Sequence, residues 1–507
     1  MLYLGSGPAR LLAALAFGLA LTAPLAAQTP LPGLDAAGMD LTVRPGDDFF
    51  GYANGTWLRE TEIPASRSSF GAFNIAAAQA ERQLTEVVHS AAASDAPPGS
   101  DLRRIGAYYT AYLDTTAINA AGLAPLQPTL DRIAAIDSRA ALARVIGATL
   151  RADVDVINDG ALHTDNLFGL WVDQDFDQPT RNSAALLQGG LALPDRSYYL
   201  DESPGMEEIR TAYRAHVARM LALAGIPDAT AKADAVLRLE TRIAAAHWNR
   251  EDSWDVVRGN NHWSRADFAV QAPGLDWDAF FSAAGLGDLD TLVAWQPSAI
   301  TGLSALVASE PLDAWKALLT YHAIEHRAAV LPAAFDREAF AFFGHTLSGT
   351  PAQRTREERA VAATSEALGF AVGRQYVERY FPASAKARAE AMVANIVAAF
   401  DARIDALPWM APETRAAAKA KLRTLRVSVG YPDRWPGYDG LDVAPDDAYG
   451  NAEAVERFEY RQALAKLRAP VDRDEWAMTP QMVNAVNMPA MNALNFPAAI
   501  LQPPFFD

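Results

Sequence analysis

The sequence predicts a mainly α-helical protein, on the strength of helical periodicity, alanine-rich stretches and the lack of βαβ alternation. Residues 387–407 carry apolar side chains at spacings of four and three, which places them on one face of a helix. These side chains are Met392, Ile396, Phe400, Ile404 and Leu407. Alanine-rich runs such as 384–399 favour helix because alanine loses no side-chain entropy.

The N-terminus predicts a secretory signal peptide over residues 1–27. Arg10 is its only charged residue, and the apolar run 11–21 follows. Small residues then lead to a cleavage site near Ala26 or Ala27. The run is short for a membrane span, and no cysteine follows it to carry a lipid. We therefore expect an exported protein, periplasmic or secreted, with no transmembrane segment after the signal.

A second helix is predicted over residues 233–248, where Val236, Leu239, Ile243 and His247 share one face. His247 on this apolar face is interpreted as a hydrogen-bonded core histidine. Proline and glycine interrupt the pattern most strongly across 430–446, which is the best candidate for a domain boundary. Beyond residue 480, short apolar pieces separated by asparagine and proline predict strand and loop.

Length, charge and composition narrow the possible functions. A chain of 507 residues exceeds what one hydrophobic core usually organises, so two lobes are expected. The net charge of -17 argues against nucleic acid as a partner, because phosphate binding needs clustered lysine and arginine. The sequence has no cysteine, so any metal must be bound by histidine and carboxylate side chains.

One pattern fits such a metal site, the HxxEH formed by His322, Glu325 and His326. On a helix the two histidines would share a face, as zinc ligation requires. The alternative is a helical segment that places two histidines four residues apart by chance. The sequence contains no HExxH and no GxSxG nucleophile motif.

Several longer motifs carry a more specific signal, and they occur in a fixed order along the chain. They are 47–57 (DDFFGYANGTW) with Ile63-Pro64, 193–199 (LPDRSYY), Trp409-Met410, Thr414-Arg415, Lys421-Leu422, 430–433 (GYPD), Glu475-Trp476, 483–485 (VNA) and 496–506 (FPAAILQPPFF). In this order the chain resembles the neprilysin and endothelin-converting-enzyme family of zinc metallopeptidases, in its bacterial secreted form. The resemblance extends from about residue 40 to the last residue.

The resemblance implies a large helical lobe and a thermolysin-like catalytic lobe that act on peptides. It divides the chain into the signal 1–27, an N-terminal segment 28–76 that packs on the catalytic lobe, a helical lobe 77–450 and the start of the catalytic lobe 451–507. The fold class expected is thus mainly α, with an incomplete thermolysin-like lobe. Asn484 and Ala485 match the family's edge-strand residues, whose side-chain amide and carbonyl hold the substrate backbone.

Two departures from the family pattern affect the expected peptide-binding surface. Val486 and Asn487 occupy positions where the family has aromatic residues. Ser69 stands where some members have an arginine for the substrate carboxylate, so a preference for free C-termini is not expected.

The largest departure lies at the end of the chain. The family's HExxH and its third zinc ligand would follow Asp507, the last residue, so no catalytic or metal residue of the family can be matched here. The catalytic residues are therefore expected beyond Asp507. We expect a sequence truncated within the catalytic lobe, with Phe505 and Phe506 left to pack on the missing part.

Three hypotheses follow. The first is an exported zinc endopeptidase. It is inactive as this chain stands, because the zinc ligands and the glutamate that activates water belong to the missing part. The second is a non-catalytic helical protein that binds peptides without metal. The third is a zinc enzyme that uses His322 and His326.

Overall fold

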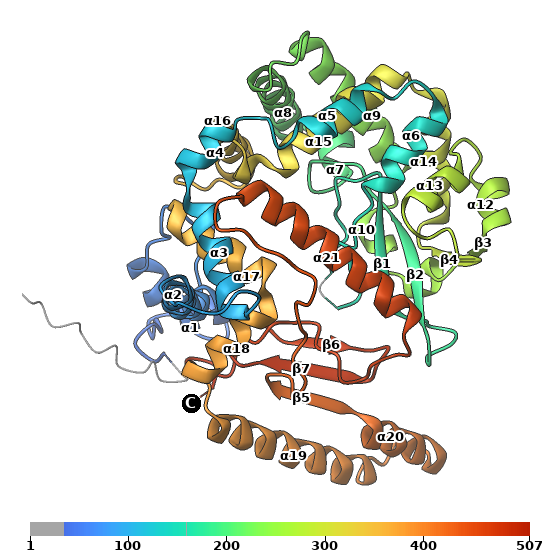
Figure 1. The fold of residues 1–507 in the computed structure, drawn as a ribbon. Coiled ribbons are helices and arrows are strands. Elements are labelled where there is room, and N and C mark those ends of the chain that lie inside the picture. The colour runs from blue at the N-terminus through green and yellow to red at the C-terminus, as the bar shows by residue number, and fades with distance from the viewer. Residues whose placement is uncertain (1–34, 159, 507) are drawn as a thin grey trace, which may run out of the picture.

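The computed structural model describes residues 35–158 and 160–506. Figure 1 shows a large helical part built around one sheet and, below it, a smaller sheet with helices on its outer side. The prediction of a mainly α-helical fold is confirmed. No helix of the described residues is both long and apolar enough to cross a membrane.

Two of the sequence predictions concern the ends of the chain and lie outside the described residues. The predicted signal peptide 1–27 and the first residues of the segment 28–76 precede the described range. Asp507, beyond which the catalytic residues are expected, follows it. The signal peptide and the truncation at Asp507 therefore stay predictions.

The first part of the chain is helical up to the first strand. Its helices are α1 (Phe49–Glu60), α2 (Ala72–Ala92), α3 (Asp101–Leu113), α4 (Thr115–Ala121), α5 (Gln127–Ala134) and α6 (Arg139–Ala148). Side chains at their N-termini cap several of them. The side chain of Asp48 accepts a hydrogen bond from the backbone amide of Gly51 at the start of α1. The side chain of Ser100 accepts one from the backbone amide of Arg103 at the start of α3.

A four-stranded sheet lies inside the helical part, with the strand order β1-β2-β4-β3. Its strands are β1 (Phe168–Gln174), β2 (Asn182–Gln188), β3 (His262–Ser264) and β4 (Thr291–Ala294). Helices cover it, so every residue of β1 is buried. Successive β1 side chains point to opposite faces of the sheet. Leu170 packs in the main hydrophobic core, whereas Trp171 packs with Trp295 in a smaller core.

The helices between and after these strands build the main core. They are α7 (Ser197–Leu200), α8 (Pro204–Leu223), α9 (Ala229–Ala246), α10 (Arg250–Ser253), α11 (Val256–Gly259), α12 (Arg265–Gln271), α13 (Trp277–Ala283), α14 (Pro297–Ser309), α15 (Leu312–His326), η1 (Ala328–Val330), α16 (Ala333–Ala339), the π-helix η2 (Phe340–Leu347), α17 (Arg356–Ala367) and α18 (Gly369–Tyr380). The predicted helix at 233–248 corresponds to α9. His247 lies just after it and is bonded to the carbonyl of Gly189 at 3.0 Å, which agrees with its interpretation as a core histidine.

The smaller sheet has the order β5-β7-β6, with β5 (Arg426–Gly430) parallel to β7 (Ala493–Pro497) and β6 (Val486–Met488) antiparallel to it. The strands predicted beyond residue 480 are therefore present. On the outer side of this sheet lie α19 (Ala383–Asp405) and α20 (Pro412–Thr424). Because β5 shares a sheet with β6 and β7, strands from both sides of the predicted boundary at 450 belong to one sheet; the boundary itself stays a prediction.

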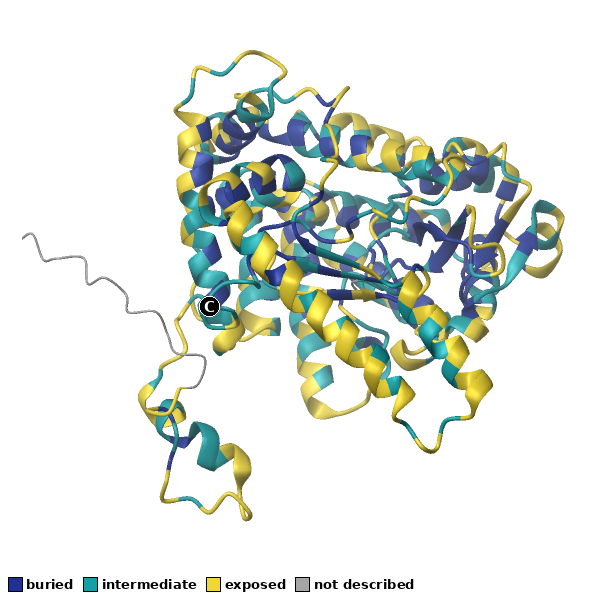
Figure 2. Cartoon of the chain, turned by 90° about the horizontal axis from the view of Figure 1, so that it is seen from below, coloured by how far each residue is buried: buried dark blue, intermediate teal, exposed yellow. Residues whose placement is uncertain are grey.

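The apolar stripe that predicted α19 is not covered by the described residues. Met392, Ile396 and Phe400 are 40%, 48% and 59% exposed, although the helix itself is confirmed. The reason is position: α19 contacts α20 and β5 at the rim of the molecule. Exposed residues accordingly dominate these two helices, and Figure 2 shows the face below the small sheet.

Helix α21 (Ala448–Arg468) joins the two parts. It packs against α3, β1 and β2 and then leads to the small sheet. The β1–β2 hairpin supports its C-terminal end, since the amide of Asn182 donates to the carbonyls of Lys466 and Ala469. The ammonium of Lys466 also lies between Asp173 and Glu475.

Candidate functional site

The two predicted substrate-binding residues lie at the beginning of an edge strand. Asn484 and Ala485 immediately precede β6, and both are exposed. β6 pairs with β7 on one side, and within the described chain no strand pairs with its other side. An exposed edge of this kind offers backbone donors and acceptors to an added strand.

The segment before this edge is held firmly. The side-chain amide of Gln481 donates to the carbonyl of Gly369 at 3.0 Å and to the hydroxyl of Ser365 at 3.1 Å. The carbonyl of Pro480 accepts the amide of Ala499. These bonds tie the approach to β6 to α18 and to the segment after β7, so Asn484 projects from a fixed base.

The two residues that depart from the family pattern have different environments. Val486 is 6% exposed and packs with Met478, Met488 and Met491 in a small core. Asn487 is exposed on the opposite face of the strand. The missing aromatic at 486 therefore changes the small core, and only Asn487 changes the exposed surface of the edge.

A hollow lies within the helical part. Three adjoining cavities of about 430, 900 and 480 Å³ share Arg151 and His326 in their walls. The largest is bounded by residues of α3, α15, α17, η2 and α21. Cavities of several hundred Å³ are large enough for part of a peptide.

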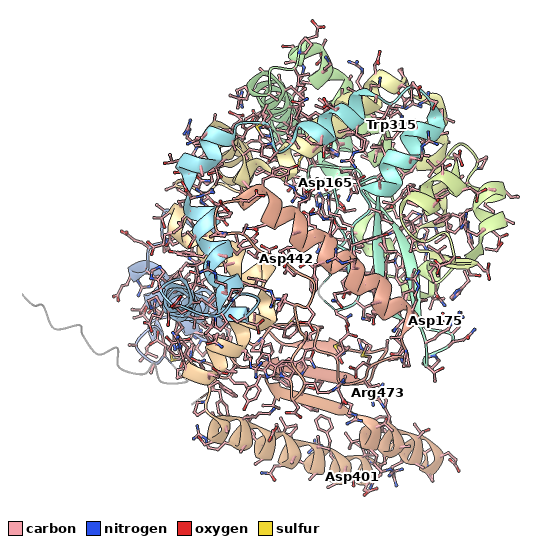
Figure 3. The ribbon with its side chains drawn as sticks, viewed as in Figure 1. Asp165, Asp175, Trp315, Asp401, Asp442 and Arg473 are labelled. Carbon is pink, nitrogen blue, oxygen red and sulfur yellow. The ribbon has the colours of Figure 1, made fainter. Side chains whose placement is uncertain are left out.

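Ion pairs line most of this hollow. Arg327 pairs with Glu456 of α21, and Arg151 pairs with Asp153 at 3.1 Å and with Asp165, which Figure 3 labels. Burial raises the pKa of Glu456, but its bonds to His326 and Arg327 outweigh this effect, so the pKa lies well below the usual value. The wall thus carries charges that compensate one another.

Glu459, on the same helix, is an exception. It is exposed to the largest cavity and makes no ion pair among the described residues. Enclosure by the surrounding protein raises its pKa to about 7, with a further contribution from the carboxylates of Glu456, Glu366 and Asp153. A carboxyl group with this pKa can accept or release a proton near neutral pH.

The HxxEH residues do not converge on a common point. The Nε2 of His322 lies 2.8 Å from Glu240 of α9, which is fully buried and also accepts the hydroxyl of Tyr213. His326 bonds instead to Glu456 of α21. Burial lowers the pKa of His326 below its usual value, and the bond to Glu456 offsets this effect only in part.

Glu325, the third member of the motif, turns toward α8. It accepts a hydrogen bond from His216 at 3.0 Å, while the other ring nitrogen of His216 donates to Glu338 of α16. Each polar residue of the HxxEH is thus bonded to a different helix. The structure therefore favours the chance interpretation of this motif over the zinc enzyme.

The residues of the described chain do not fit the catalytic zinc of the family that the sequence resembles. That zinc requires two histidines one helical turn apart, directed at one point, and His322 and His326 are not. The catalytic and metal residues expected beyond Asp507 lie outside the described residues, so their existence stays a prediction.

One other group could share a metal ion. Within the described residues, Asp175, Asp177 and His262 are the side chains close enough to do so. They lie on a loop and a strand, and the group contains a single histidine. It is therefore different in kind from the zinc site of the family.

Sequence reasoning missed this group and the residues that line the hollow, although the family resemblance implies a cavity under the helical lobe. The wall of the hollow contains Arg151, His326 and Glu459, and no local sequence motif connects these residues. Asp175 and Asp177 form a visible Asp-x-Asp after a buried strand, but nothing in the sequence relates them to His262. Only the pairing of β4 with both β2 and β3 brings these elements together.

The buried His216 generates a prediction about pH. Burial lowers its pKa, but the bonds and charges of Glu325 and Glu338 outweigh burial, so the pKa stands above its usual value. A histidine whose pKa is raised by folding contributes its full stabilisation of the folded state below the unfolded-state pKa of about 6.5. This contribution is lost as the pH rises through the folded-state pKa. We expect the melting temperature of the wild type to fall as the pH rises above about 6.5, and this fall to be smaller in His216→Gln.

Thermal unfolding followed by circular dichroism measures this difference. His345→Gln serves as the control, because it alters an exposed histidine that has no carboxylate partner among the described residues. Identical pH profiles for the wild type and His216→Gln would contradict the assignment of a charged His216.

Comparison with known proteins identifies the family. The sequence profile of peptidase family M13 matches residues 45–432. Human endothelin-converting enzyme-like 1 is 28% identical over 487 residues, a match that covers 93% of this chain and 62% of the human protein. The chain thus spans about 62% of the length of such relatives.

Solved structures agree with this match. The zinc metalloprotease ZMP1 of Mycobacterium tuberculosis, in complex with an inhibitor, superposes with a TM-score of 0.85 at 37% identity, covering 94% of this chain and 71% of that one. PEPO of Lactobacillus rhamnosis shares the fold, with a TM-score of 0.79 at 24% identity, covering 92% of this chain and 72% of that one. The chain therefore belongs to peptidase family M13, the family of neprilysin and the endothelin-converting enzymes.

Proposed function

We propose that this chain is the helical and substrate-holding part of an exported zinc endopeptidase that acts on peptides. The observation that supports this most directly is the open edge of β6, with Asn484 and Ala485 exposed at its beginning. A peptide that adds to this edge would bond through its backbone, while the Asn484 amide both donates and accepts. The hollow beside α21 would accommodate peptide extending from the site.

The substrate role of Asn484 can be tested by peptide binding. We expect Asn484→Ala to weaken the binding of a fluorescent peptide by about ten-fold, because one or two hydrogen bonds are lost. Fluorescence anisotropy with the purified chain measures this change. Asn395→Ala, which alters an exposed asparagine on α19, far from the β6 edge in sequence, is the matched control. Equal affinities for the wild type and Asn484→Ala would exclude the proposed role.

We further propose that the catalytic residues belong to sequence that continues after Asp507. This agrees with the shorter span of the chain relative to its relatives and with the exposed apolar stripe of α19. Sequencing the gene beyond the codon for Asp507 tests the idea. A frame that continues into an HExxH would support it.

A confirmed stop codon without a downstream HExxH would favour the alternative, a peptide-binding protein without catalysis. The cavity and the edge strand are compatible with that function, since both are built from residues of this chain. Such a protein would bind peptide equally well in the presence of a chelator.

Export is proposed from the composition of residues 1–27. We expect an alkaline phosphatase reporter fused after residue 40 to be active outside the cytoplasm, because its disulfides form only there. The double change Leu15→Arg and Leu19→Arg should abolish this activity by interrupting the apolar run. Leu15→Ile with Leu19→Ile keeps the run apolar and should leave export unchanged. Export of the arginine variant at the wild-type level would refute the signal.

A further inference from the structure

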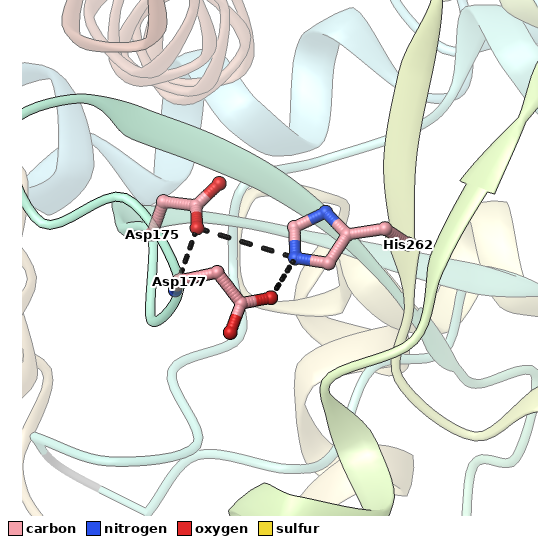
Figure 4. Close-up of side chains that lie close together, drawn as sticks. All are labelled: Asp175, Asp177 and His262. Atoms are coloured by element: carbon pink, nitrogen blue, oxygen red, sulfur yellow. Dashed lines mark hydrogen bonds and ion pairs between the residues drawn. The ribbon is translucent and has the colours of Figure 1, made fainter.

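Two carboxylates and one imidazole meet at an end of the four-stranded sheet. Asp175 and Asp177 lie in the loop that follows β1, and His262 begins β3. Figure 4 shows a ring nitrogen of His262 directed between the two carboxylates. The Nε2 of His262 lies 3.1 Å from Asp177 Oδ2 and 4.0 Å from Asp175 Oδ1.

These spacings are close to those between ligands of a tetrahedral zinc ion. With zinc–ligand distances of about 2.0–2.1 Å, neighbouring ligand atoms are about 3.3 Å apart. The three candidate atoms lie within 4.8 Å of one another. Asp177 is already at 3.1 Å from Nε2, so completing the geometry requires His262 and Asp175 to approach each other by about 0.7 Å.

The Nε2 atom of His262 lacks a hydrogen-bond partner among the described residues, and a bound cation would provide a partner for it. Its Nε2 is inaccessible to solvent and makes no hydrogen bond of acceptable geometry within the described chain, although two carboxylate oxygens are near. In the tautomer that carries its proton on Nδ1, the Nε2 lone pair would be repelled by both carboxylates. Either a proton or a metal ion at Nε2 removes this repulsion.

A second polar atom without a partner among the described residues lies next to the group. The amide nitrogen of Asn260 donates to Asp177 Oδ2 at 3.1 Å, while its carbonyl Oδ1 is buried without a hydrogen bond. Rotation of this amide by half a turn would place its oxygen beside Asp177 Oδ2, at the spacing of two ligands of one metal. Asn260 could therefore supply a fourth ligand.

Asp175 is held in a fixed orientation. Its Oδ1 accepts the amides of Asp177 and Gln178, both at 2.9 Å, and its Oδ2 accepts the guanidinium of Arg181. Such outer partners orient metal ligands in known sites.

We propose that Asp175, Asp177 and His262 bind one divalent transition cation of the zinc class. One imidazole with two carboxylates suits zinc better than magnesium or calcium, which prefer oxygen ligands alone. Asp177 is 64% exposed on its side chain, so the ion can enter from solvent. The bound ion joins the β1–β2 hairpin to β3 and so stiffens the hairpin on which α21 ends.

The test is zinc binding by the full chain, freed of metal by chelation and carrying no affinity tag. Isothermal titration with zinc chloride should show one site, and affinity should fall at least ten-fold in Asp177→Asn and in His262→Gln. Asp47→Asn is the matched control for the first variant, because the side chain of Asp47 is 66% exposed and, like that of Asp177, lies within ion-pair distance of a basic side chain. His345→Gln is the control for the second, and both controls should bind zinc as the wild type does.

A second measurement separates loss of the site from loss of the fold. Zinc should raise the melting temperature of the wild type and of both controls, and it should leave that of Asp177→Asn unchanged while the circular dichroism spectrum stays native. Absence of zinc binding by the wild type would overturn the proposal. So would equal binding by His262→Gln, or stronger binding of magnesium or calcium than of zinc.

Discussion

The polar bonds of α15 are the constraint on which the centre of the helical part depends. His322, Glu325 and His326 each bond to a different helix, namely α9, α8 and α21. For the buried pair of His322 and Glu240, removing one partner leaves an uncompensated buried group and costs about 3–5 kcal/mol. The three pairs therefore fix the relative positions of four helices, and they do so with side chains that sequence alone could assign to zinc.

The same constraint shapes the hollow. Because His326 is bonded to Glu456, α21 is held across the cavity and its charged face lines the wall. At its other end α21 rests on the β1–β2 hairpin, and the chain then leads to Asn484 and the β6 edge. The position of the β6 edge is thus set by contacts within the helical part, many residues away in sequence.

Much of the fold could be predicted because its signals are local. The spacing of apolar residues predicts α19 and α9. The short apolar pieces separated by asparagine and proline beyond residue 480 predict strands, and strands are present there. The site was harder to predict. Asn484 and Ala485 were found through an ordered set of motifs, whereas Glu459 and the group formed by Asp175 and His262 depend on contacts between distant segments.

The sequence by itself determined the mainly helical class, the family and the two residues at the edge strand, since periodicity and motif order are properties of neighbouring residues. Only the tertiary structure decided what the histidines do. His322 and His326 share a helix face, yet the carboxylates of Glu240 and Glu456 on two other helices direct them apart. His262 has no motif at all, yet the pairing of β4 with β3 and β2 brings it to Asp175. The direction of a side chain is set by its partner in space, and that partner is not encoded in local spacing.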